Sequence, residues 1–264
     1  MTVLVGGVYQ LYQGDLDLGR VAVGRLSRAG LGPGVYVEEL AYGAVAVAQR
    51  LEDLRPGALV LVGAAERGRE PGSVERRRHE PLDLRPEQAQ LAVGEAVVGY
   101  VSLDLLLEVA SGLCALPKRT VAIEAEPASR EPSEELSAPA KAALERCLEL
   151  VREEVERLPV LELADELREL LAPRAQEPAG ALWALHDLLD ELESVDREGR
   201  WGQTFALRER LRREIAAGHT PEGMSALDWG LWWALVEELD RLEAPEERIG
   251  TEASPDGGRP PGDS

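Results

Sequence analysis

Positive charge is scarce in this sequence: 29 lysine and arginine residues face 49 aspartate and glutamate residues, which gives a formal net charge of −20. The only lysines are Lys118 and Lys141. Nucleic-acid sites concentrate basic side chains on one surface, so this balance argues against a nucleic-acid partner. It argues equally against binding to an anionic membrane surface, and we expect neither kind of partner.

Cysteine is almost absent, and long apolar runs are absent. Cys114 and Cys147 both lie in apolar, helix-like surroundings, so we expect buried, reduced thiols and no disulfide. Residues 1–7 lack the basic start of a secretory signal, and no apolar run has the length of a membrane span. These features predict a soluble, cytoplasmic protein.

Aromatic residues divide the chain, because all five tyrosines precede residue 101 and all five tryptophans follow residue 180. Short β-branched runs alternate with helical patterns in the first part. This alternation predicts an α/β domain over residues 1–157, in three layers, with a mostly parallel central sheet flanked by helices. The expected strands are residues 2–5, 35–39, 58–62 and 120–125, and the expected helices are residues 19–28, 44–54, 102–113 and 139–157.

Residues 158–243 have helical periodicity throughout and predict an all-helical C-terminal appendage. Its helices are expected near residues 160–171, 178–195, 204–217 and 221–242. The final residues 244–264 are acidic and rich in proline and glycine, so we predict a disordered tail.

Arginine gathers at Arg76, Arg77 and Arg78, followed by His79, within a polar segment over residues 66–89. We interpret this segment as an exposed loop with a short strand near residues 73–76. In an acidic chain the run is best explained as solvated charge that balances the nearby glutamates.

Trp229, Trp232 and Trp233 share a predicted helix face with Val236, at the spacing i, i+3, i+4, i+7. One interpretation is core packing against neighbouring helices. The other is that part of this aromatic stripe docks a protein partner, because tryptophan is enriched at interface hot spots.

The α/β part also carries a series of motifs. Residues 4–19 read as a strand leading into Gly7, then Gly14 and Asp15, and a helix that opens at Gly19. Further matches follow in order at residues 37–43, 59–65, 69–74 and 121–139, the last of which includes Glu124-Ala125-Glu126-Pro127, Ser129, Glu131 and Leu136-Ser137-Ala138-Pro139. Over about residues 1–156 the chain therefore resembles the NiFe-hydrogenase maturation endopeptidase family.

The resemblance implies an endopeptidase that removes a C-terminal extension from the hydrogenase large subunit once nickel is installed. It also implies a metal site of two carboxylates and one histidine. In this chain those positions fall at Leu16, Gly63 and Gly99, and none of these side chains can bind a metal. We therefore expect no cofactor, with nickel only if the family's chemistry survives on other residues.

Weak substitutes lie near the lost ligands, namely Asp15, Asp17, Glu66 and Asp104. No histidine is close to them in sequence, and an all-carboxylate site would favour magnesium, calcium or manganese over nickel. The competing interpretation is that Asp15 and Asp17 cap the helix that starts near Gly19. No other catalytic arrangement is evident, since G-x-S-x-G is absent.

Three hypotheses follow. The first is a non-catalytic relative of the endopeptidases that binds a hydrogenase large subunit, its precursor or another maturation factor. The second is an active nickel-dependent endopeptidase with relocated ligands. The third is a binding or structural protein that has kept only the fold, because fold does not fix function.

Overall fold

A computed structural model describes residues 1–80, 82, 85–96, 101–172, 181–216 and 226–243. Within these ranges the chain forms a five-stranded sheet in the order β2-β1-β3-β5-β4. The strands β1, β2, β3 and β5 run parallel, and β4 joins the edge antiparallel to β5. The strands are β1 (Val3–Gly7), β2 (Val35–Glu39), β3 (Ala58–Ala64), β4 (Val74–His79) and β5 (Arg119–Ala125).

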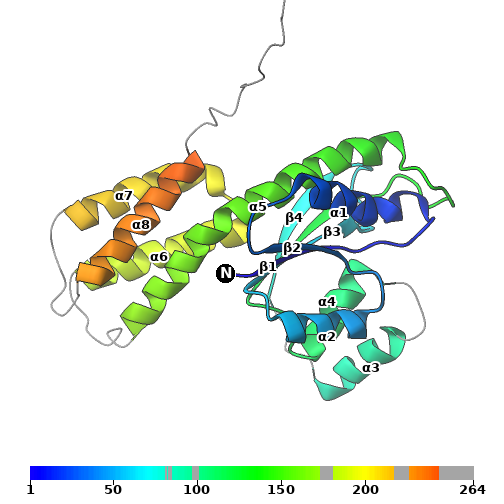
Figure 1. Ribbon diagram of the computed structural model, residues 1–264, viewed down its shortest axis with the longest axis horizontal. Coiled ribbons are helices and arrows are strands. Elements are labelled where there is room, and N and C mark those ends of the chain that lie inside the picture. Colours follow the sequence, from blue (N-terminus) through cyan, green and yellow to red (C-terminus); the bar gives the residue numbers. More distant parts are fainter. Residues whose placement is uncertain (81, 83–84, 97–100, 173–180, 217–225, 244–264) are drawn as a thin grey trace, which may run out of the picture.

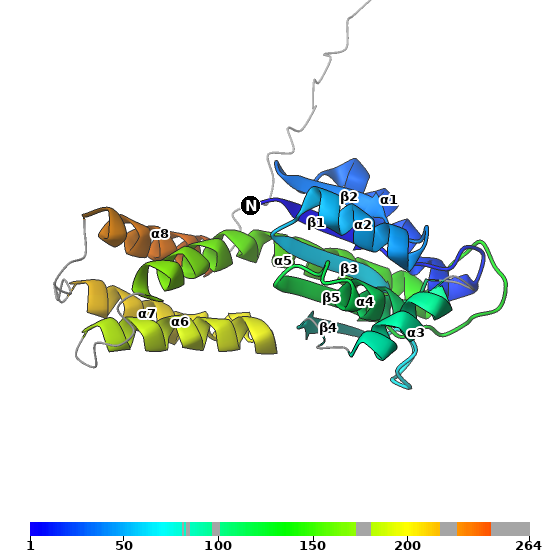
Figure 2. The same ribbon diagram turned by 90° about the horizontal axis from the view of Figure 1, so that it is seen from below.

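Helices cover both faces of the sheet, as Figures 1 and 2 show. One face packs against α1 (Leu18–Ala29) and α5 (Ala138–Leu171), and the other against α2 (Ala44–Leu54) and α4 (Leu103–Gly112), beside α3 (Pro86–Ala96). Alternate strand residues serve the two faces, so Val3 and Val5 belong to one core and Leu4 to the other. This confirms the predicted three-layer α/β fold with a helical C-terminal part.

The predicted break between two helices at residues 157–160 is wrong. A single helix of 34 residues, α5, continues through Pro159. Proline inside a helix removes one backbone hydrogen bond and costs about 3 kcal/mol. Leu158, Val160 and Leu161 are buried on both sides of it, and their packing offsets that cost.

The long helix α5 belongs to both parts of the molecule, since it leaves the sheet and enters the helical appendage (Figure 1). There it packs against α6 (Ala181–Glu198) and α8 (Ala226–Glu243). These two helices also contact α7 (Thr204–Ala216), which the short 3₁₀ helix η3 (Trp201–Gln203) precedes. The predicted tail, residues 244–264, lies outside the described residues. Among the described helices, none has the length and apolar character needed to cross a membrane.

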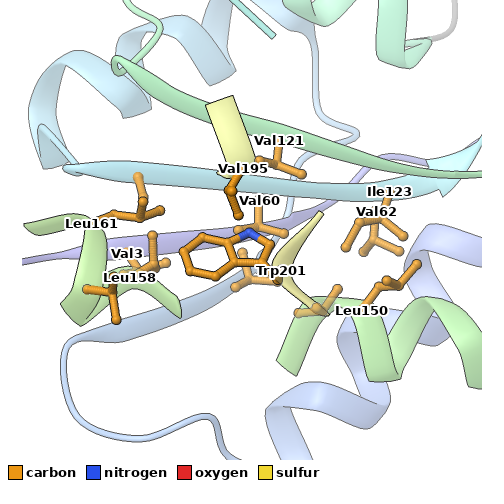
Figure 3. Close-up of a cluster of buried hydrophobic side chains, with 14 of the residues drawn as sticks. Val3, Val60, Val62, Val121, Ile123, Leu150, Leu158, Leu161, Val195 and Trp201 are labelled. Carbon is orange, nitrogen blue, oxygen red and sulfur yellow. The ribbon is translucent and has the colours of Figure 1, made fainter. Parts of the chain in front are cut away.

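Trp201 ties the appendage to the sheet. Its side chain is 8% exposed. Figure 3 shows it among buried side chains from β1, β3, β5, α5 and α6, including Val60, Leu158 and Val195. The Arg157 guanidinium lies 5.4 Å from the centre of the indole ring. The α/β part and the appendage therefore share one hydrophobic core.

Trp201→Ala is expected to lower the free energy of unfolding by about 3–5 kcal/mol, because it leaves a large cavity in that core. Trp201→Phe should cost only about 1–2 kcal/mol, since the buried indole nitrogen has no hydrogen-bond partner to lose. The matched control is Trp233→Ala on α8, where the side chain is 47% exposed and the expected change is within about 0.5 kcal/mol. Urea unfolding followed by circular dichroism measures all three, and equal losses at both tryptophans would contradict the shared core.

The arginine run is not a solvated loop, which corrects the sequence interpretation. Residues 74–79 form the edge strand β4, and the side chains of Arg76 and Arg78 are only 8% and 6% exposed. Arg76 donates hydrogen bonds to Glu154 of α5 at 2.7 and 2.9 Å and to Asp196 of α6 at 2.9 Å. Arg76 therefore holds α5 and α6 against the sheet edge.

The two cysteines differ, and the expectation that both are buried is wrong for Cys114. Cys147 is buried in α5, and burial raises the pKa of its thiol to about 12. Cys114 is exposed just beyond the end of α4, with a left-handed backbone. Both are free thiols, as expected.

Candidate functional site

A cleft of about 280 Å³ opens at the carboxyl ends of β1 and β3. Residues that follow these strands form two of its walls, the start of α4 forms a third, and Leu16 and Arg130 border it. Strand order reverses between β1 and β3, and open α/β sheets bind ligands at this kind of switch point. The cleft is therefore the candidate functional site.

The three positions that the sequence resemblance matches to metal ligands are Leu16, Gly63 and Gly99. Leu16, in the short 3₁₀ helix η1 (Gly14–Asp17), lines the cleft with an apolar side chain. Gly63 lies near the end of β3, where a Cβ atom would stand 2.6 Å from the Val8 carbonyl oxygen. An acid at Gly63 would require the backbone to shift. Gly99 lies outside the described residues.

The Asp15 carboxylate accepts hydrogen bonds from the backbone of another segment. Asp15 is 1% exposed and accepts hydrogen bonds from the backbone N–H groups of Ala128 at 2.8 Å and Ser129 at 2.9 Å. Its carboxylate also accepts from the N–H of Ser137 at 2.7 Å and from its hydroxyl at 2.8 Å. Ser137 is the N-cap of α5, so Asp15 anchors that helix start and the loop before it.

Asp17 is 2% exposed and accepts hydrogen bonds from the Arg20 guanidinium at 2.8 and 2.9 Å. It occupies the N-cap position of α1, but its side chain makes no capping hydrogen bond there. The interpretation of Asp15 and Asp17 as side-chain caps of this helix is therefore wrong. Asp15 reaches α5, and Asp17 makes an ion pair.

The two remaining substitutes border the cleft as halves of ion pairs. Glu66 pairs with Arg130 at 2.9 Å, and both side chains are more than half exposed. Asp104 accepts two hydrogen bonds of 2.8 Å from Arg67, and these hold the pKa of Asp104 below its usual range. Each of these carboxylates already has an arginine as its counter-ion.

These contacts decide whether a metal would fit. Nickel needs several imidazole, thiolate or carboxylate donors that converge. Within the described ranges, no group of three or more such side chains is placed to hold a metal ion. The substitutes point to different protein partners, so the donor set does not fit nickel.

Two further polar side chains of the cleft, those of Tyr9 and Ser102, are engaged by protein partners. Burial, and next its hydrogen bond to Glu39, raise the pKa of Tyr9 to about 12. The Tyr9 hydroxyl therefore stays protonated at neutral pH. Ser102 caps α4 by accepting a hydrogen bond from the N–H of Leu105 at 3.2 Å.

Glu124 and Glu126 form a buried charge network beside the cleft that the sequence interpretation missed. Glu124 is fully buried in β5 and accepts hydrogen bonds from Arg67 at 2.8 and 2.9 Å. Glu126 accepts from the N–H groups of Arg67 and Gly68 at 2.8 and 3.1 Å. Burial raises both pKa values, but these hydrogen bonds outweigh it and lower them overall. A glutamate inside an otherwise apolar strand was the available signal, because such a charge needs a buried cation.

The tryptophan stripe separates into core and surface. Trp232 is completely buried and Trp229 is half-buried against the same core, while Trp233 is 47% exposed. A docking role for Trp232 is therefore wrong, because its side chain has no surface. For Trp233 the docking role stays a prediction.

No protein-family model matches the chain, and no curated protein matches it. Among solved structures it is similar to a hydrogenase 2 maturation peptidase from a Thaumarchaeota archaeon, at 30% identity and a TM-score of 0.45, covering 59% of this chain and 98% of that protein. It is also similar to the NiFe-hydrogenase maturation protease HycI from Thermococcus kodakarensis, at 21% identity and a TM-score of 0.45, covering 59% and 92%. The maturating endopeptidase HybD from E. coli follows, at 24% identity and a TM-score of 0.42, covering 57% and 90%.

Proposed function

We propose that this protein is a non-catalytic relative of the NiFe-hydrogenase maturation endopeptidases that acts in large-subunit maturation as a binding or assembly factor. One observation carries the proposal. The cleft at the switch point is present, but the four carboxylates nearest the family's ligand positions, Asp15, Asp17, Glu66 and Asp104, are all engaged by protein partners.

The motif glycines support the same proposal. A Cβ atom at Gly19 would lie 2.2 Å from the Val8 carbonyl oxygen, so the close approach of α1 to the end of β1 requires glycine there. The signature thus retains the residues that shape the scaffold around the cleft. The residues that would bind metal have been replaced, as at Leu16 and Gly63.

Binding without cleavage is the expected result with a hydrogenase large-subunit precursor from the same organism. Interferometry should detect the complex, and mass spectrometry should find the precursor's C-terminal extension intact after incubation with nickel. Leu16→Arg places a positive charge in the cleft and should weaken the complex about tenfold or more. Leu170→Arg is the matched control, since Leu170 is exposed on the appendage half of α5.

Two results would contradict the proposal. Loss of a C-terminal peptide from the precursor would establish the active endopeptidase with relocated ligands. Stoichiometric heat on titration of the metal-free protein with nickel or cadmium, abolished by Glu66→Ala or Asp104→Ala, would point the same way. Absence of a complex with the precursor would leave the other maturation factors as the partners to test in the same assay.

A further inference from the structure

A second and larger cavity, of about 710 Å³, lies between the edge strand β4 and helix α4. Arg77 and His79 of β4 line one side, and Leu107, Glu108 and Ser111 of α4 line the other. Only Asp104 is shared with the cleft described above. The volume of this second cavity lies in the range of small-molecule sites, which is about 300–1,000 Å³.

Two polar atoms at this cavity lack hydrogen-bond partners. Ser111 is 5% exposed, and its hydroxyl oxygen is buried without a partner. Nε2 of His79 is also buried without a partner. Buried polar atoms in folded proteins are nearly always hydrogen-bonded, so each of these two atoms would be stabilised by a partner that a ligand in the cavity can supply.

The charged groups around the cavity are paired, with one exception. Arg77 pairs with Glu124 at 3.2 Å, Arg197 of α6 with Glu80 at 3.2 Å, and Asp104 with Arg67 at 2.8 Å. Arg78 is 6% exposed, donates to the Lys118 carbonyl at 2.9 Å and lies 3.8–3.9 Å from Asp196 and Glu193. Among the described residues, Glu108 makes no ion pair or hydrogen bond.

Glu108 also stands where a negative charge is unfavourable. It lies near the C-terminal end of α4, where the helix dipole is negative, and no basic residue occupies the last turn. A cation in the cavity would relieve both effects. The chain as a whole, at a net charge of −20, would attract it.

From this geometry we propose that the cavity binds an organic cation, namely a primary ammonium or guanidinium group on a short aliphatic chain. The Glu108 carboxylate is its counter-ion. The Ser111 hydroxyl and the His79 imidazole, whose unpartnered atoms are shut off from solvent in the free protein, turn toward the cavity and accept its N–H groups. Leu82 and Leu107 supply apolar contact for the methylene groups. Burial, and next the charge of Arg77, lower the pKa of His79, which leaves the imidazole neutral with one nitrogen able to accept.

The test uses the full chain and three probes of equal length: n-butylammonium, n-butanol and butyrate. We expect nuclear magnetic resonance titration to show millimolar binding of butylammonium, with shifts at Ser111 and His79, and at least tenfold weaker binding of the other two. Binding should also lower the pKa of His79 further, because a second cation then faces the ring. Preference for butyrate, or no binding of butylammonium at these residues, would overturn the proposal.

Variants locate the site. Glu108→Gln keeps the shape of the side chain and should weaken butylammonium binding about tenfold, and Ser111→Ala should weaken it less. Glu134→Gln, which removes the same charge from an exposed side chain outside the cavity, is the matched control and should leave binding unchanged. Equal effects of the two glutamine substitutions would mean non-specific attraction to an acidic protein and would overturn the site.

One further probe identifies the source of the amine. Nα-acetyl-lysine amide presents the same group as a lysine side chain in a peptide. Binding at least as tight as that of butylammonium would assign the cavity to a basic side chain of a polypeptide. If butylammonium binds and Nα-acetyl-lysine amide does not, the cavity is assigned to a free amine.

Discussion

Asp15→Ala is expected to lower the free energy of unfolding by at least about 3 kcal/mol and the Tm by about 10 °C. The substitution leaves three backbone N–H groups and the Ser137 hydroxyl without their buried acceptor. Each buried donor left unpaired costs about 1–3 kcal/mol. Differential scanning calorimetry measures the change, and hydrogen exchange should increase most at Ala128, Ser129 and the start of α5.

The neighbouring acid supplies the control. Asp17→Ala removes one ion pair to the partly exposed Arg20 and should cost only about 1–2 kcal/mol. A family-type metal role for Asp15 predicts a different outcome, in which Asp15→Ala leaves the Tm of the metal-free protein unchanged and abolishes nickel binding. That outcome would reverse the assignment of Asp15 as an anchor of helix α5.

Arg76→Ala is expected to cost about 3–5 kcal/mol, because it leaves the buried Asp196 without its hydrogen-bonded cation and removes one of the two arginines that pair with Glu154. Arg76 binds α5 and α6 from the sheet edge, so the loss should also loosen the appendage. Urea unfolding measures the stability, and limited proteolysis between the two parts reports the loosening. Arg130→Ala is the matched control, since its pair with Glu66 is exposed and is worth at most about 1 kcal/mol.

The loss of unfolding free energy in the Arg76→Ala variant should depend on pH. Burial above all raises the pKa of Asp196 even beside its arginines, and removal of Arg76 raises it further. Asp196 in the folded variant then binds a proton more readily than in the unfolded chain, so the contribution of Asp196 to the unfolding free energy increases as pH falls. The difference in unfolding free energy between the wild-type protein and the variant should therefore become smaller from about pH 7 to about pH 5. If this difference in unfolding free energy stayed constant or widened as pH falls, the unpaired charge of Asp196 would not be what destabilises the Arg76→Ala variant.

The local sequence pattern predicted secondary structure well where all the residues of a segment share one environment. The strands β1, β3 and β5 are short apolar runs with buried side chains on both faces, and the sequence predicts them within a few residues. The N-cap of α5 at Ser137 was likewise predictable, because serine with proline two residues later is a helix-start pattern.

The candidate site was predictable only by position. Sequence placed Leu16 and Gly63 where the family has metal ligands, and both lie at the cleft or directly behind it. What the nearby acids do could not be predicted. Asp15 bonds to residues 113–122 positions away, and Asp104 to an arginine 37 positions away. Such partners depend on which loops the fold brings together.

The sequence by itself determined the layered α/β architecture and the helical appendage. It also determined that no metal-binding side chain stands at the three positions to which the resemblance points, because periodicity and side-chain chemistry are local properties. Tertiary structure alone decided that Pro159 lies inside one continuous helix, that Arg76 and Arg78 are buried, and that Asp15 holds a helix start. The physical reason is common to all three. A proline, an arginine or an aspartate tolerates a costly position only when distant groups supply the packing or hydrogen bonds that offset the cost.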